Sequence, residues 1–148
     1  MAGDIVQDNE RSRDELRTLT ASLADADLAR GLGNGWTVST VFCHLAFWDR
    51  VVLRRIADWQ RNGFAPVRLN PPTVDSINDA VREISRAVPG REAARMALES
   101  AEAIDALVER LSPHLVEEID ASGFARTLRR SVHRRDHLRR INDALGRS

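Results

Sequence analysis

Three of the four histidines in this chain occupy positions from which they could share one metal ion. His133 and His137 are four residues apart, so on a helix they lie one above the other on the same face. His44 lies in another stretch with helical apolar spacing, one turn before Trp48. Three neutral imidazoles around an ion leave a coordination position for water or a substrate. The residues alone leave two interpretations open, a metal site or three ordinary core histidines.

The ligand set narrows the chemistry that such a site would perform. Three histidines without a carboxylate suit zinc, nickel or another late divalent ion. The run from His133 to His137 reads His-Arg-Arg-Asp-His, which lacks the glutamate that follows the first histidine in zinc peptidases. We therefore exclude peptidase chemistry.

Two further residues of reactive type are not expected to join this site. Cys43 directly precedes His44, so its side chain points about 100° away around a helix, and we expect a buried structural thiol. His114 follows Pro113 and is expected to be exposed and without a role.

The helices that would position these side chains are visible as apolar periodicity. We expect helices at residues 4–24, 38–61, 73–88, 91–111 and 124–145. Thr37 or Ser39 would cap the helix that carries His44, and Thr73 would cap the next one. Residues 115–123 are expected to form a connection, and because no segment alternates with a period of two, we predict no strand. Amphipathic helices joined by loops indicate an all-α helix bundle.

The glycine spacing between Gly31 and Gly35 also suggests a phosphate-binding loop, but no strand is predicted before it. We interpret this stretch as a flexible approach to a helix.

At its tryptophans and histidines the chain resembles the DinB-like proteins. The motif consists of Trp36-Thr37, His44-Leu45 and Trp48-Asp49 around the second helix, followed by the His133 and His137 pair on the last helix. The resemblance covers nearly the whole chain in the order and spacing of its helices. The family includes the metal-binding domain of mycothiol-dependent maleylpyruvate isomerase.

The resemblance implies a fold and an activity. The implied fold is an antiparallel four-helix bundle with a crossover between the second and third helices. It implies that His44, His133 and His137 hold a divalent metal ion, zinc or nickel, and that this ion activates a low-molecular-weight thiol such as mycothiol for attack on an electrophilic substrate. The alternative is a non-catalytic bundle that acts through dimerisation, in which the metal site is structural or vestigial. A homodimer is the expected assembly, since a bundle with an exposed apolar face commonly dimerises.

The length and composition of the chain indicate its number of domains and its location. The chain has 148 residues, and we expect a single domain over residues 1–148. One cysteine, no leader-like N-terminus and no long apolar run favour a cytoplasmic protein without a membrane span.

Arginine is the most conspicuous residue type. All 22 basic residues are arginine, the formal net charge is zero, and several arginines lie on the last helix. Because these point in several directions, and because acidic residues such as Asp105 lie on the preceding helix, a nucleic-acid partner is not expected. Arg54, Arg55 and arginines of the last helix are instead candidates for holding a substrate carboxylate.

Overall fold

The computed structural model describes residues 2–147, and these residues are predominantly helical, as the sequence predicts. The elements in chain order are α1 (Ala2–Ser22), α2 (Asp25–Leu28), β1 (Gly31–Gly33), β2 (Trp36–Thr37), α3 (Val38–Asn62), α4 (Pro71–Ser85), α5 (Gly90–Glu109), α6 (Pro113–Ala121), α7 (Ala125–Leu128) and α8 (Arg130–Ala144).

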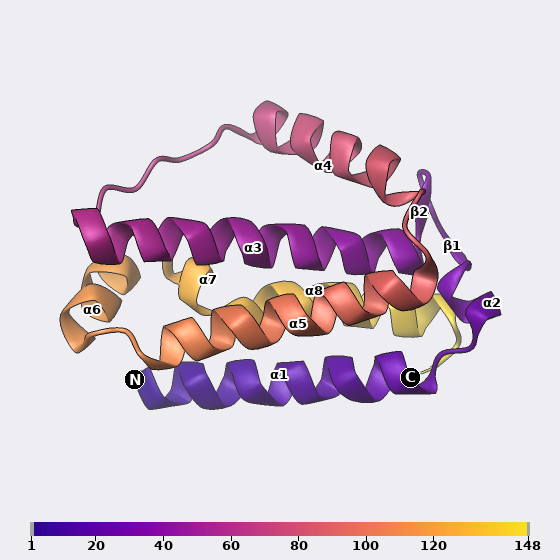
Figure 1. Ribbon diagram of the computed structural model, residues 1–148, viewed down its shortest axis with the longest axis horizontal. Helices are drawn as coiled ribbons and strands as arrows, with labels where there is room; N and C mark the ends of the chain where they lie inside the picture. Colours follow the sequence, from indigo (N-terminus) through magenta and orange to yellow (C-terminus); the bar gives the residue numbers. More distant parts are fainter. Residues whose placement is uncertain (1, 148) are drawn as a thin grey trace.

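The long helices α1, α3, α5 and α8 lie side by side (Figure 1). Helix α5 packs between α3 and α1, and α8 contacts both α1 and α3. Followed along the chain, α3 and α5 run in the same direction, whereas α1 and α8 run in the opposite one. This is possible because α4 lies along the outer side of α3 and carries the chain back to the other end of the molecule (Figure 1).

The interior holds two apolar clusters with a polar layer between them. One cluster gathers around Leu16 of α1 and Leu45 of α3, and the other includes Val52 and Ile56 further along α3. Between Leu45 and Val52, the buried Asp49 interrupts the apolar stripe of α3. Burial of large aliphatic side chains stabilises a fold by roughly 1.5–3 kcal/mol each, so the two clusters supply most of the driving force.

The structure differs from the sequence prediction at residues 31–37, where no strand was expected. β1 and β2 pair antiparallel, with Gly31 opposite Thr37 and Gly33 opposite Trp36. The turn between them places Asn34 at φ 54° and Gly35 at φ 80°, a left-handed conformation that these two residue types tolerate best. The strands are too short to show an alternating pattern, which is why the periodicity did not reveal them.

The start of α4 also differs from the prediction that Thr73 caps it. Asn70 is the capping residue: its side-chain oxygen accepts a hydrogen bond from the Thr73 amide at 2.9 Å. Pro71 and Pro72 then fit the first turn, where an amide proton is not needed.

The C-terminal third contains more separate helices than the sequence predicts. Most of the predicted connection at residues 115–123 is helical, as α6, whose cap Ser112 accepts from the Leu115 amide. The predicted helix at 124–145 is broken at Arg129, whose φ of −88° and ψ of 68° separate α7 from α8. The histidine pair lies wholly on α8, so the break leaves its spacing intact.

Candidate metal-binding site

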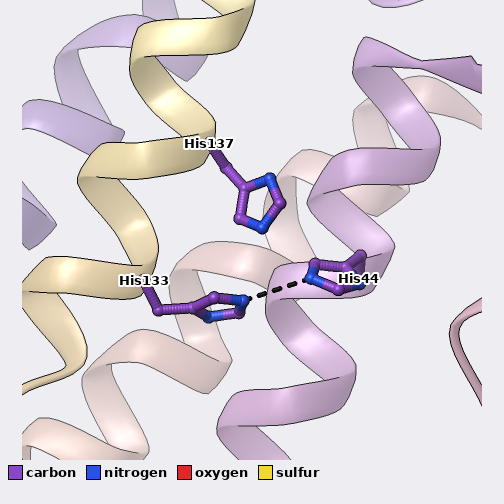
Figure 2. Close-up of side chains that lie close together, drawn as sticks. All are labelled: His44, His133 and His137. Carbon is purple, nitrogen blue, oxygen red and sulfur yellow. Dashed lines mark hydrogen bonds between the residues drawn. The ribbon is translucent and has the colours of Figure 1, made fainter. Parts of the chain in front are cut away.

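The three predicted histidines meet where α8 lies against α3. His44 projects from α3, and His133 and His137 project from consecutive turns of α8 (Figure 2). The start of α3 is fixed by a reciprocal cap two turns before His44: Thr37 Oγ1 accepts from the Thr40 amide at 3.1 Å, and Thr40 Oγ1 accepts from the Thr37 amide at 2.8 Å. This cap fixes the residue at which α3 begins, and therefore the position of His44 along the helix.

The distances between the rings suit a shared ion. His44 Nε2 and His133 Nε2 are 3.1 Å apart, and one nitrogen from each of the three rings lies within 4.8 Å of the others. Two nitrogens bound to a tetrahedral zinc at about 2.0–2.1 Å are separated by about 3.3 Å. The first pair is close to this separation, and the His137 ring centroid lies 4.6 Å from that of His44.

The hydrogen bonds of the cluster leave one buried nitrogen unpaired. Arg130 Nη2 donates to His133 Nδ1 at 3.0 Å, and since a guanidinium only donates, the His133 proton sits on Nε2 and is shared with His44 Nε2. His44 Nδ1 is buried and, among the described residues, has no hydrogen-bond partner. Such an orphan destabilises a fold by about 1–3 kcal/mol.

The same hydrogen bonds show what must change when an ion enters. Coordination through His133 Nε2 requires the proton on that nitrogen to leave. Nδ1 then carries the ring proton, so Arg130 must turn away from it.

All three imidazoles are held in the neutral form that a metal ligand requires. Burial, together with the nearby His137, Arg130 and Arg140, lowers the pKa of His44 from 6.5 to about 3. Burial and Arg140 lower the pKa of His137 to about 4. The pKa of His133 is also strongly lowered, first by burial and then by Arg130. At neutral pH no proton has to be removed from a charged ring before an ion binds.

The metal-free protein is expected to lose stability as the pH falls below about 6.5. In the unfolded chain the histidines gain a proton near that pH, whereas the folded rings stay neutral until about pH 4 for His137 and about pH 3 for His44. Each ring then lowers the free energy of unfolding by up to about 1.4 kcal/mol per pH unit across that window. Urea unfolding at pH 7, 6 and 5 measures the effect.

The variant His137→Gln isolates the contribution of one ring to this pH dependence. Between pH 7 and pH 5, its free energy of unfolding is expected to fall less steeply than that of the wild type, by up to about 1.4 kcal/mol per pH unit. A variant with the wild-type slope would contradict the assignment of His137 as a half-buried ring that stays neutral.

The cluster opens into a cleft of about 550 Å³ between α3, α4 and the C-terminal helices. Its lining comprises His44, Trp48, Val52, Arg55, Val67, Arg68, Leu69, Val74, Asn78, Phe124, Arg126, Arg130, His133 and His137. Trp48 Nε1 donates to Asn78 Oδ1 at 2.8 Å, which joins the wall on α3 to the wall on α4. Trp36 packs edge-on against the His44 ring, with 5.5 Å between ring centroids.

Sequence reasoning found only part of this lining. Arg55 and two arginines of the C-terminal helices were candidates and do line the cleft, whereas Arg54 faces away from it and is exposed. The walls contributed by residues 67–69 and by α4 were missed. They come from a proline-rich loop and a helix whose placement depends on packing against α3, and no local motif indicates that placement.

Cys43 and His114 lie outside the cleft, as expected. The Cys43 thiol is buried, lines a separate apolar pocket between α3, α4 and α5, and has a pKa raised by that burial. His114 is exposed on α6, with its Nε2 3.6 Å from a Glu118 carboxylate oxygen.

A buried charge network lies directly behind the histidines. Arg130 donates through Nε to Asp49 at 2.8 Å, and the fully buried Arg134 forms a two-pronged pair with Asp105 at 2.7 and 2.9 Å. The second oxygen of Asp49 is 3.5 Å from Arg134, and Arg13 also donates to Asp105. This network confirms that acidic residues from other helices neutralise part of the charge of the last helix.

The fold and the cluster together define a class: a helical protein in which three histidines from two helices converge on an open cleft. A family model described as the DinB superfamily matches residues 8–146, nearly the whole chain. The chain belongs to the DinB superfamily, as the motifs of the sequence predicted. Comparisons with curated proteins and with solved structures give no match. None of the helices within residues 2–147 is long and apolar enough to cross a membrane.

Proposed function

We propose that this protein binds one divalent metal ion, zinc or nickel, through His44, His133 and His137, and that it is a metalloenzyme acting on a small thiol and an electrophilic substrate. The observation that carries the proposal is the convergence of three neutral imidazoles at the base of an open cleft. A purely structural zinc site is closed and has four protein ligands. Here, within the described residues, three histidines face a space large enough for a small molecule.

The proposed chemistry is a thiol transfer or isomerisation, as in the mycothiol-dependent relatives that the chain resembles. When bound, the ion would supply a positive charge that lowers the pKa of a thiol in the cleft. The residues of the chain would do the rest: three histidines hold the ion, Trp48 forms an apolar wall, and Asn78 fixes the position of that wall. No protein side chain is needed as the nucleophile.

The remaining features of the molecule are assigned as part of the same proposal. Helices α1, α3, α5 and α8 are the family's antiparallel four-helix bundle, α4 is its crossover, and residues 1–148 form one domain. We further propose a homodimer and a cytoplasmic location.

A non-catalytic dimeric module is the second candidate, and one observation favours it. Ile84 on α4 is 74% exposed beside the apolar pocket that Cys43 lines. An exposed apolar side chain next to an apolar hollow is typical of an interaction surface. In this alternative the metal site would be structural or vestigial.

Metal content and cobalt spectroscopy distinguish the two candidates. Untagged protein dialysed against zinc or nickel without chelator is expected to retain about one ion per chain by elemental mass spectrometry. The cobalt-substituted protein is then titrated with a small thiol such as cysteamine. An open site is expected to give a new sulfur-to-cobalt absorption band, because the thiolate enters the free coordination position.

Each outcome decides one level of the proposal. If the protein retains no ion after dialysis and buffer exchange, the proposal that it is a metalloprotein is wrong. Protein that retains cobalt but shows no spectral response to the thiol overturns the enzymatic proposal and favours the structural module.

A further inference from the structure

Four arginines line the cleft that holds the histidines. They are Arg55 of α3, Arg68 of the loop before α4, Arg126 of α7 and Arg130 of α8. The described lining contains no aspartate or glutamate, and its histidines are neutral. A small space bounded by four guanidinium groups favours an anionic ligand.

These arginines differ in how far their charge is already neutralised. Arg130 is committed to the buried Asp49. Arg126 pairs with Asp136 at 3.5 Å, but both side chains are more than half exposed, so this pair is easily exchanged for a ligand. Arg68 lies over the Phe124 ring at 4.6 Å, which positions the guanidinium without neutralising it.

Arg55 is the clearest unpaired cation of the four. It is half-buried and, within residues 2–147, makes no ion pair or hydrogen bond. Its neighbour Arg54 is exposed and lies outside the cleft. A half-buried guanidinium at the wall of a cavity is therefore available to bind a carboxylate through two parallel hydrogen bonds, in the bidentate geometry.

Apart from the histidines and Asn78, the rest of the lining is apolar. Trp48, Val52 and Val74 come from the two helices on either side of the cleft, and Val67 and Phe124 complete the wall. Val67 is 70% exposed, so its side chain offers apolar surface to a molecule in the cleft. The lining thus combines a binding group for an anion with a surface for a hydrocarbon or aromatic body.

We propose that the cleft binds a small carboxylate with an apolar or aromatic body, in which Arg55 and Arg126 hold the carboxylate and the Trp48 wall contacts the body. The proposal rests on the proposed function in taking this cleft as the substrate site, and it names the class of the electrophilic substrate. The proposal places the carboxylate at the arginines and the reactive part of the molecule at the histidines of the same cleft.

The probe is phenylacetate, with phenylacetamide as its uncharged match of nearly the same shape. Binding to metal-free and to zinc-loaded protein is followed by calorimetry and by tryptophan fluorescence, since Trp48 lines the cleft. Phenylacetate is expected to bind saturably in both states and at least about tenfold more tightly than phenylacetamide, because only the carboxylate pairs with the guanidinium groups. Acetate is expected to bind more weakly than phenylacetate, since it lacks the body that the apolar wall contacts.

Two pairs of variants assign the binding group. Arg55→Gln and Arg126→Gln are each expected to weaken phenylacetate binding about tenfold and to leave phenylacetamide unaffected. The controls Arg54→Gln and Arg129→Gln remove a neighbouring arginine outside the lining and are expected to bind as the wild type does. Unfolding midpoints close to that of the wild type verify that the variants fold.

The proposal is overturned if phenylacetate does not saturate in either state, if the amide binds equally well, or if all four variants weaken binding to the same extent. These results are independent of the metal proposal. A protein that retains zinc but does not bind phenylacetate loses only the carboxylate assignment, and one that binds phenylacetate without retaining metal loses only the metalloenzyme assignment.

Discussion

Alanine in place of His133 is expected to weaken zinc binding on the order of a thousandfold. Zinc bound to small protein sites contributes about 10–16 kcal/mol, so one of three ligands accounts for roughly 4 kcal/mol, and each 1.4 kcal/mol is a factor of ten. His133 Nε2 is 3.1 Å from His44 Nε2, so His44→Ala is expected to have a similar effect. Competition with a zinc-binding dye measures both variants against the wild type.

The fourth histidine supplies the control for that experiment. His114→Ala removes an exposed imidazole on α6 that lies outside the cluster, and it is expected to keep wild-type affinity and one ion per chain. The assignment of the ligands would be wrong if His133→Ala retained wild-type affinity, or if His114→Ala lost the ion. Unfolding midpoints measured beside the zinc titrations separate a loss of affinity from a loss of folding, because an alanine leaves a cavity at either position.

The histidine site could be predicted because its signals are local in sequence. An i, i+4 pair already fixes which face of α8 carries His133 and His137, and the apolar stripe of α3 fixes the side on which His44 lies. These two faces meet because α3 packs against α8. Apolar periodicity within one helix does not predict which other helix it packs against. The DinB-like motifs supplied that link.

The rest of the site depends on contacts between distant residues. Arg134 is one of seven arginines between Arg126 and Arg140, and only its partners on α3 and α5 explain why it is completely buried. The short strands and the break at Arg129 escape periodicity for another reason: each spans too few residues to form a pattern. Long periodic helices were therefore predictable, and the short elements and buried charges were not.

Methionine in place of Arg134 is expected to lower the free energy of unfolding by about 3–5 kcal/mol. The arginine has no exposed side-chain surface and forms a two-pronged pair with Asp105, together with hydrogen bonds to the Asn9 carbonyl and Ser12 Oγ. Its removal leaves Asp105 buried with Arg13 alone, and Asp49 with Arg130 alone. Urea unfolding at pH 7 in metal-free protein measures the loss.

The adjacent residue offers a matched control. Arg135 forms ion pairs of similar length with Asp8 and Glu15, but its side chain is 32% exposed and its partners are at the surface. Because water competes for exposed charges, Arg135→Met is expected to change the free energy of unfolding by about 1 kcal/mol or less. Equal losses for Arg134→Met and Arg135→Met would contradict a special role for burial.

The double variant Arg134→Met, Asp105→Leu separates the loss of a pair from the exposure of an unpaired charge. Most of the loss in Arg134→Met comes from the carboxylate that it leaves behind, so removing Asp105 as well is expected to recover more than half of the stability. If the double variant is instead as unstable as the sum of the two single variants, the pair does not act as a unit. The recovered protein would also test how the network serves the site: Asp49 keeps its ion pair with Arg130, which holds α8 against α3, so zinc affinity is expected to be kept. Loss of zinc binding in a stable double variant would show that Arg134 positions the metal ligands through Asp49, beyond its contribution to stability.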